Sequence, residues 1–163
     1  MLKLLFDTNG RIGRARFWLG MVLLLIGGFV IFGVLVALGF GHTESVTTTT
    51  TVGSNPPATT EGWKSTLSPW GNFIFQVVEL YPGLALCLKR RHDRDNAGYD
   101  LMVVTFAALV LALFNALDLG LGILSGLLGA VVFFGLFYLF VVLGLLRGTP
   151  GPNRFGADPL LNP

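Results

Sequence analysis

The chain has 163 residues, of which 53% are hydrophobic and only 12% charged, and its mean hydropathy is +0.71. Soluble domains carry about 25% charged residues, so this composition argues against one or two soluble domains and favours a membrane protein with several spans. The single cysteine, Cys87, excludes an internal disulfide and a cysteine-rich metal site, and the two histidines are far apart. We therefore expect no metal site and no cofactor.

The first apolar run covers residues 17–40 and contains no charged side chain. It exceeds the ~20 residues that are needed to cross the hydrocarbon core of a bilayer. Four basic residues precede it, so a signal peptide is the alternative, but the apolar core of a signal peptide has only about 7–15 residues. The run predicts a first transmembrane helix.

The segment 41–68 is rich in threonine, contains a Pro-Pro pair and offers almost no apolar side chains for burial. This composition predicts a flexible loop with short extended pieces, which we interpret as a tether rather than as a functional element. Trp63 and Trp70, like Trp18 at the start of the first span, occupy positions where tryptophan anchors a span at the membrane interface.

The segment 69–88 is a weaker candidate span because it contains four residues that are unusual in a bilayer: Asn72, Gln76, Glu79 and Pro82. The first three are spaced at i, i+4 and i+7 and therefore share one face of a helix. A charged carboxylate in mid-span costs at least about 2.5–3.5 kcal/mol on insertion scales. We expect Glu79 to face the other helices for this reason.

This polar stripe has two interpretations. The favoured one is a hydrogen-bonded lock that also uses Asn115 in the third span and Tyr138 in the fourth, with Tyr138 the polar group nearest in depth to Glu79. The alternative is a path for protons or solutes, which would make the protein a small transporter or channel.

The last apolar run, 101–146, is too long for a single crossing. At ~1.5 Å per residue it would extend about 69 Å, against a core of about 30 Å. It predicts a helical hairpin that turns within residues 118–126. The predicted spans are 17–40, 69–88, 101–118 and 125–146.

The basic residues support this count. If the N-terminus lies inside, the inner segments 1–16, 89–100 and 147–163 carry ten of the eleven Lys and Arg residues, and Lys64 alone lies outside. This is a strong positive-inside bias. We predict an all-α polytopic integral membrane protein, a single domain over residues 1–163, with four transmembrane helices in a bundle and both termini in the cytoplasm.

Three motifs lie at the predicted inner ends of the spans: "GRIGRARFW" from Gly10, "KRRHDRDNAGY" from Lys89 and "GTPGPNRFGADP" from Gly148. In this order and at these places they resemble the bacterial inner-membrane "domain of unknown function 805" proteins. The residues that carry the resemblance are Gly10, Arg11, Arg14, Phe17, Trp18, Arg90, His92, Asp93, Asp95, Gly98, Gly148, Thr149, Gly151, Asn153, Phe155, Gly156, Asp158 and Pro159. The resemblance implies an integral protein of the bacterial inner membrane, with no established activity.

The three motifs are expected to meet on one cytoplasmic surface. Asp93 is predicted to accept hydrogen bonds from Arg11 or Arg14 and so to tie the N-terminal segment to the loop between the second and third spans. The alternative is that the cations only set the topology. The residues that we expect to bind an anion or a partner are Arg11, Arg14, Lys89, Arg90, His92, Asp93, Asn153 and Arg154.

The leading hypothesis is a non-enzymatic protein, without catalytic residues, whose basic face binds anionic phospholipid headgroups or a protein partner; we expect no nucleic acid. Small residues spaced by four could serve close packing in the bundle or a homo-oligomer. They are Gly33, Ala37 and Gly41 in one stripe, and Gly122, Gly126 and Ala130 in the other.

Overall fold

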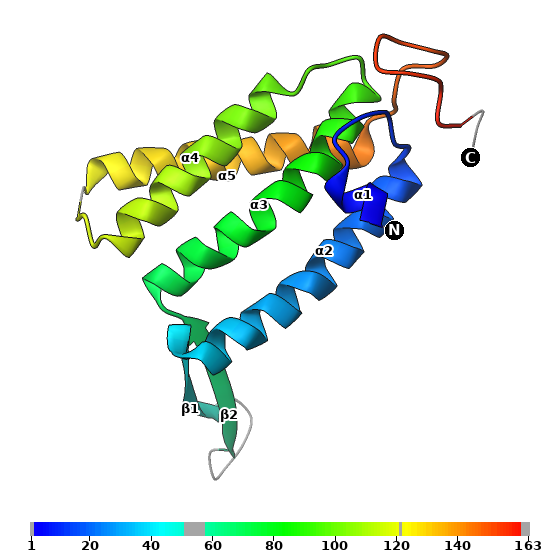
Figure 1. The fold of residues 1–163 in the computed structure, drawn as a ribbon. Coiled ribbons are helices and arrows are strands. Elements are labelled where there is room, and N and C mark those ends of the chain that lie inside the picture. Colours follow the sequence, from blue (N-terminus) through cyan, green and yellow to red (C-terminus); the bar gives the residue numbers. More distant parts are fainter. Residues whose placement is uncertain (1, 51–57, 121, 161–163) are drawn as a thin grey trace.

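The computed structural model describes residues 2–50, 58–120 and 122–160 of the chain. The fold is helical apart from one β-hairpin (Figure 1). In chain order the elements are α1 (Leu2–Phe6), α2 (Arg14–Leu35), the π-helical turn η1 (Val36–Phe40), β1 (Gly41–Thr50), β2 (Ala58–Leu67), α3 (Pro69–His92), α4 (Tyr99–Ala116), α5 (Ile123–Leu139) and the π-helical turn η2 (Phe140–Leu145).

Four helical segments are long and apolar enough to cross a membrane: Arg14–Phe40, Pro69–His92, Tyr99–Ala116 and Ile123–Leu145. The predicted all-α class with four membrane-spanning helices is thereby confirmed, and so is the division of the last apolar run into two helices. The largest difference in bounds is at the end of α3, which continues four residues beyond the predicted limit of 88 and carries a basic cluster on its last turn.

Local signals explain where α3 begins. The side chain of Ser68 accepts a hydrogen bond from the backbone N–H of Gly71 at 3.1 Å, and Pro69 occupies the first turn, where its missing N–H has no cost. The helix continues through Pro82 in its interior. In η1, Gly39 has φ +87°, a conformation that glycine adopts easily, and the chain leaves the helix there for β1.

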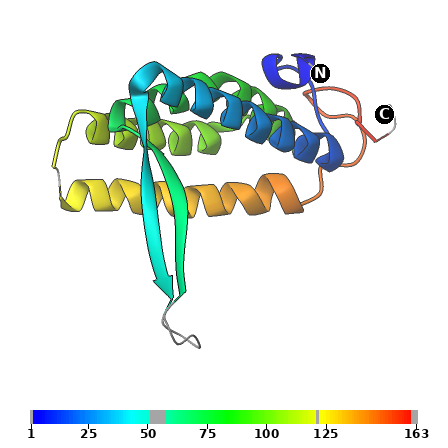
Figure 2. The same ribbon diagram turned by 90° about the horizontal axis from the view of Figure 1, so that it is seen from below.

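The spans pack in sequence order, with α2 on α3, α3 on α4 and α4 on α5, and α2 meets the fourth span at η2. Figures 1 and 2 show α1 and the C-terminal tail (residues 147–160) together at one end of the bundle, which we call the terminal end. The β-hairpin projects from the opposite end of α2 and α3.

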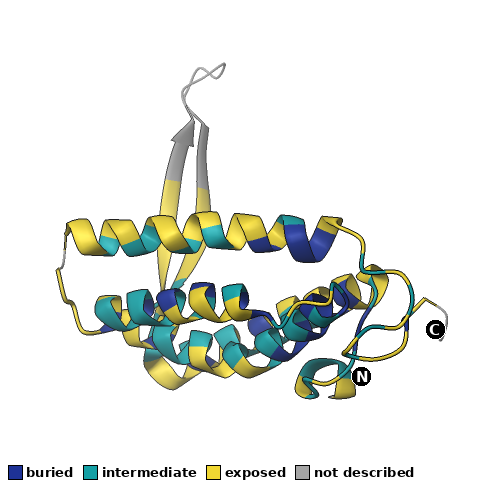
Figure 3. Ribbon diagram, turned by 90° about the horizontal axis from the view of Figure 1, so that it is seen from above, coloured by how far each residue is buried: buried dark blue, intermediate teal, exposed yellow. Residues whose placement is uncertain are grey.

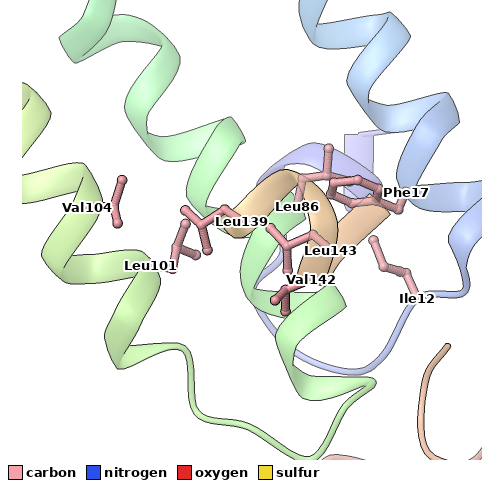
Figure 4. Close-up of a cluster of buried hydrophobic side chains, with 8 residues drawn as sticks. All are labelled: Ile12, Phe17, Leu86, Leu101, Val104, Leu139, Val142 and Leu143. Atoms are coloured by element: carbon pink, nitrogen blue, oxygen red, sulfur yellow. The ribbon is translucent and has the colours of Figure 1, made fainter. Parts of the chain in front are cut away.

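Buried residues gather at the terminal end (Figure 3). Their apolar part is a cluster that joins the N-terminal segment to all four spans (Figure 4). It comprises Ile12, Phe17, Leu86, Leu101, Val104, Leu139, Val142 and Leu143. Elsewhere large apolar side chains on the spans are exposed, for example Phe29 at 69% and Phe133 at 67%. Such apolar surface suits contact with lipid.

Glycines allow the spans to approach closely, but not mainly at the predicted stripes. A Cβ on Gly135 would meet Val104 of α4 at 2.5 Å, and a Cβ on Gly144 would meet the Trp18 ring at 2.8 Å. Gly33 and Gly126, from the two predicted stripes, have open space beside them. The stripes therefore do not mediate packing inside the bundle at these two positions, and a homo-oligomer remains a prediction.

The threonine-rich segment is more ordered in structure than expected. β1 and β2 pair antiparallel in an unbroken register from Gly41 opposite Leu67 to Thr50 opposite Ala58. The Thr43 and Ser65 hydroxyls are 2.7 Å apart across the strands. The extended pieces are longer than expected because β-branched threonine favours strands even where little apolar surface is buried. The Pro-Pro pair lies outside the described residues.

Candidate functional site

Charged side chains at the end of α3 are buried. Arg90, Lys89 and Arg91 are 1%, 3% and 5% exposed, and Asp93, just after the helix, is 3% exposed. Arg11, which precedes α2, is also buried. Buried charges require ion pairs and hydrogen bonds. Every buried side-chain nitrogen and oxygen among the described residues has a hydrogen-bond partner.

Asp93 is the centre of these contacts. Its Oδ1 accepts hydrogen bonds from Nε and Nη2 of Arg11 at 3.3 and 3.1 Å, and its Oδ2 accepts one from Nη1 of Arg90. The predicted contact between Asp93 and Arg11 is confirmed. Arg14, the other predicted partner, donates instead to the Leu145 carbonyl at 3.4 Å.

The same two arginines bind backbone carbonyls with their remaining N–H groups. Arg11 donates to the carbonyls of Thr149, Gly151 and Gly156 at 2.7, 2.7 and 3.2 Å. Arg90 donates to the carbonyls of Leu143, Leu146 and Ile12 at 2.9, 2.5 and 3.4 Å. Two of these carbonyls belong to the end of the fourth span, where helical carbonyls lack partners of their own. The arginines thus hold the tail and the last span in place.

The tail closes over Asp93. The Thr149 backbone N–H and hydroxyl both donate to the Asp93 carbonyl, at 2.8 and 3.0 Å. Gly148 lies against the Asp93 carboxylate so closely that a Cβ there would overlap its atoms. This close approach explains why the residue before Thr149 is glycine.

His92 and Asn153 complete the closure. Nδ1 of His92 lies 3.3 Å from the Gly10 carbonyl, and its ring stacks on Phe155 with centroids 4.0 Å apart and an interplanar angle of 6°. The Asn153 amide donates to the His92 carbonyl at 2.9 Å and to the Thr149 hydroxyl at 3.1 Å. These contacts are structural roles for residues that the sequence marked as candidate binding residues.

Asp158 shapes the end of the tail. Its carboxylate accepts the backbone N–H groups of Leu160 at 2.9 Å and Gly151 at 2.8 Å. These two hydrogen bonds, with a smaller contribution from the charge of Arg11, hold the pKa of Asp158 below its ordinary value. The carboxylate therefore stays ionised and keeps the tail bent.

We call this connected set the Asp93 network. It joins the segment before α2, the end of α3 and the tail, and it is built almost entirely from residues that carry the three sequence motifs. Its members are Gly10, Arg11, Arg90, His92, Asp93, Gly148, Thr149, Gly151, Asn153, Phe155, Gly156 and Asp158.

Three other cations have partners beside the network. Lys89 donates to the Lys3 and Leu4 carbonyls of α1 at 2.8 and 2.6 Å. This short helix was not predicted from the sequence. Arg91 pairs with Asp100 at the start of α4, with a 3.1 Å bond from Nε. Arg154 pairs with Asp95 at 3.1 Å, but both side chains of this pair are exposed.

A cavity of about 770 Å³ lies next to the network, and we call it the basic pocket. Its walls come from the start of α2, the end of α3 and the tail, including Arg14, Trp18 and Arg147. Arg14 and Arg147 are exposed. Gly13, which precedes α2, provides no side-chain cap, and Gly13, Arg14 and Ala15 at the start of the helix all line the pocket. The first N–H groups of a helix have no partner within the helix. Arg147 was not among the predicted site residues, because an isolated arginine after a span is the ordinary topology signal.

The intramembrane residues do not form the predicted lock. The Tyr138 hydroxyl lies 3.5 Å from Nη2 of Arg91, at the terminal end, and not against Glu79. The Asn72 amide donates to the Leu67 carbonyl at 3.4 Å beside the hairpin, and Asn115 is exposed. Tyr138 and Glu79 were predicted to lie at the same depth because they are at similar distances from the inner ends of their predicted spans. This prediction is wrong because α3 continues beyond its predicted end. Gln76 and Glu79 do share one cavity.

Across residues 2–50, 58–120 and 122–160, no group of three or more His, Cys, Asp or Glu side chains is placed to hold a metal ion.

The fold and the network define a helical membrane protein with four spans, whose terminal segments are fastened to the loop between α3 and α4. The chain belongs to the DUF805 family, described as "Protein of unknown function (DUF805)", whose model matches residues 5–157. This range includes every motif residue of the Asp93 network except Asp158, one position beyond its end. No curated protein and no solved structure matches the chain.

Proposed function

We propose that the protein binds the phosphate of an anionic phospholipid headgroup in the basic pocket, as a non-enzymatic membrane protein. The observation that carries the proposal is the position of Arg14 and Arg147 on the walls of one cavity, next to the first turn of α2. Arginines at the membrane interface and N–H groups at a helix start both favour a phosphate.

The charge of the pocket supports an anionic ligand. Its walls contain three cations, Arg14, Arg90 and Arg147, and two carboxylates, Asp93 and Asp158. Asp93 is also paired with Arg11 and Asp158 with two backbone N–H groups, so neither carboxylate is left to repel a phosphate strongly. Arg90 is occupied by the network, which leaves Arg14 and Arg147 to contact the ligand.

The position of Trp18 favours a lipid over a soluble anion. Its ring lines the basic pocket, and its Nε1 donates to the Gly144 carbonyl at 3.3 Å. Tryptophan commonly lies at the depth of the headgroups. A phosphate between Arg14 and Arg147 would then keep its acyl chains beside the apolar surface of α2 and the fourth span.

The proposal includes the orientation and the compartment. We propose that both termini lie in the cytoplasm and that the membrane is the bacterial inner membrane, supported by the distribution of ten of eleven Lys and Arg residues on one side. A compartment-sensitive reporter fused after Pro163 should be active only in the cytoplasm. Periplasmic activity of this fusion would refute the orientation.

The headgroup proposal is tested by native mass spectrometry of protein released from nanodiscs that contain equal amounts of phosphatidylglycerol and phosphatidylcholine. The wild type should retain phosphatidylglycerol preferentially. The double variant Arg14→Gln/Arg147→Gln should lose this preference. Arg16→Gln is the matched control, because Arg16 is exposed on the same helical turn but does not line the pocket.

Retention of phosphatidylglycerol that is equal in the double variant and the wild type would refute the proposal. So would equal losses in the double variant and in Arg16→Gln, because the effect would then come from surface charge in general. A copurifying protein at constant stoichiometry, in place of lipid, would favour a protein partner at this surface.

A further inference from the structure

A second cavity, of about 370 Å³, lies within the bundle at the depth of the spans, and we call it the lateral groove. All four spans contribute to its walls, and Phe17, Trp18 and Phe140 lie at the terminal end. The main contact of α2 with the fourth span is at η2 rather than along α5. In Figure 2, α5 is separated from α2 along most of its length.

The lining is apolar except at a few positions. Thr105 lines the groove, but its hydroxyl donates to the Leu101 carbonyl of its own helix at 2.8 Å. Gln76 and Glu79, one turn apart on α3, are therefore the main polar groups that remain. The groove-lining residues include no Lys, Arg or His in the part of the chain that the structure describes.

Glu79 is half-buried beside α2, where Gly28 leaves room for it. A Cβ on Gly28 would be 3.7 Å from Oε1 of Glu79. No hydrogen bond or ion pair to the Glu79 carboxylate is formed by the described residues under ordinary geometric limits. The cations of α3 lie at the end of the helix, ten or more residues away, and are held there by other partners.

We propose that the lateral groove binds an amphipathic cation, a molecule with a bulky apolar body and one positive charge that pairs with Glu79. Charge complementarity is the reason to choose this ligand over a lipid acyl chain, which would fill the apolar walls but leave the carboxylate without a partner. A groove of this size is within the range of sites that hold drug-sized molecules, about 300–1,000 Å³.

The site is separate from the basic pocket, and Trp18 is the one residue that lines both. The two sites also have opposite charge preferences. A failure of headgroup binding would therefore leave this inference intact, and the reverse also holds.

The probe is tetraphenylphosphonium, and its matched control is tetraphenylborate, which has the same shape and the opposite charge. Equilibrium dialysis against the protein in phosphatidylcholine nanodiscs, corrected for empty nanodiscs, should show saturable binding of the phosphonium ion at one site per chain. The borate ion, dialysed in a separate experiment because the two ions form a poorly soluble salt, should show no saturable binding. Glu79→Gln should weaken binding by roughly tenfold to a hundredfold, the range for loss of a charge-assisted contact.

Two further variants locate the site. Glu61→Gln makes the same chemical change on the exposed β-hairpin and should bind like the wild type. Gly83→Leu keeps Glu79 but fills the groove; a Cβ on Gly83 has no neighbour within 4 Å, so the variant should fold. It should weaken phosphonium binding. The proposal would be overturned if phosphonium binding did not exceed that of empty nanodiscs, or if borate bound as tightly as phosphonium. It would also be overturned if Glu79→Gln or Gly83→Leu bound phosphonium as well as the wild type does.

Discussion

The two acidic positions Asp93 and Glu79 lie on or next to the same helix but have opposite environments. Asp93 is shared by two buried arginines, and its own backbone carbonyl is bound by the tail. Glu79, fourteen residues earlier, lies in an apolar groove beside a glycine. Asp93 thus has its hydrogen-bond and ion-pair partners within the chain, whereas Glu79 forms no hydrogen bond or ion pair with the described residues.

The position of each region along the bundle explains this difference. At the terminal end, three segments that are distant in sequence leave the spans and can supply partners for one another; Arg11 and Asp93 are 82 residues apart. At the depth of Glu79 the neighbouring helix faces are mostly apolar, and Gln76 is the other main polar side chain of the groove. A buried ion pair often adds little net stability compared with apolar residues, yet removing one member is strongly destabilising.

Asp93→Ala should give the largest loss of stability. It would leave Arg11 and Arg90 buried without their carboxylate, and breaking a buried pair in this way costs about 3–5 kcal/mol. Thermal unfolding of the purified protein in detergent, followed by circular dichroism, measures the effect. The double variant Arg11→Ala/Asp93→Ala should lose less than the sum of the single losses, with a coupling of about 0.5–3 kcal/mol.

The matched control for this prediction is Asp95→Ala. Asp95 pairs with Arg154 at the same separation of 3.1 Å, but the two side chains are 47% and 59% exposed. Exposed pairs contribute only about 0–1 kcal/mol. Equal losses for Asp93→Ala and Asp95→Ala would contradict the importance of the network.

Exchange of the charges at positions 11 and 93 should not restore stability, because an arginine at 93 would meet Arg90 and would not fit against Gly148.

Gly148→Ala should give the next largest effect. The new methyl group would overlap the Asp93 carboxylate, so the tail must move and its bonds to the Asp93 carbonyl must lengthen. Overpacking of this kind typically costs about 1–3 kcal/mol. Limited proteolysis should cut the tail of the variant faster, and the thermal midpoint should fall.

The control is Gly151→Ala, which is strained by its φ of +75° but has no neighbour within 4 Å of a new methyl group. If the two variants lose equal stability, contact with Asp93 is not the reason for the glycine.

The fold was largely predictable because bilayer crossing imposes simple rules. Run length and the distribution of basic residues predicted the four spans and the turn between α4 and α5. The ends were harder: α1 is only five residues long, and its contacts with Lys89 are specific to the folded protein. Pairing of the hairpin was underestimated because its stability depends on cross-strand contacts that composition does not reveal.

The site was predictable in part. A carboxylate inside a basic cluster predicted the contact between Asp93 and Arg11, because a topology signal alone does not require aspartate. The sequence did not show that most candidate cations are occupied by backbone carbonyls, since such contacts depend on how the tail folds. It also misplaced Tyr138, which contacts Arg91 rather than Glu79, because α3 continues beyond its predicted end and carries Arg91 on its last turn.

The smallest effect on stability is expected for Glu79→Gln. This result would show most directly that Glu79, unlike Asp93, does not stabilise the fold. Glutamine keeps the shape of the side chain and removes a charge that is costly inside a bilayer, by at least about 2.5–3.5 kcal/mol on insertion scales. Because the described residues give Glu79 no partner to lose, the free energy of unfolding should be unchanged or higher, and Glu79→Leu should behave in the same way. Thermal unfolding beside Asp93→Ala in the same detergent provides the measurement. A loss for Glu79→Gln as large as that for Asp93→Ala would mean that Glu79 has an internal partner after all, and the carboxylate would then serve the fold rather than a ligand.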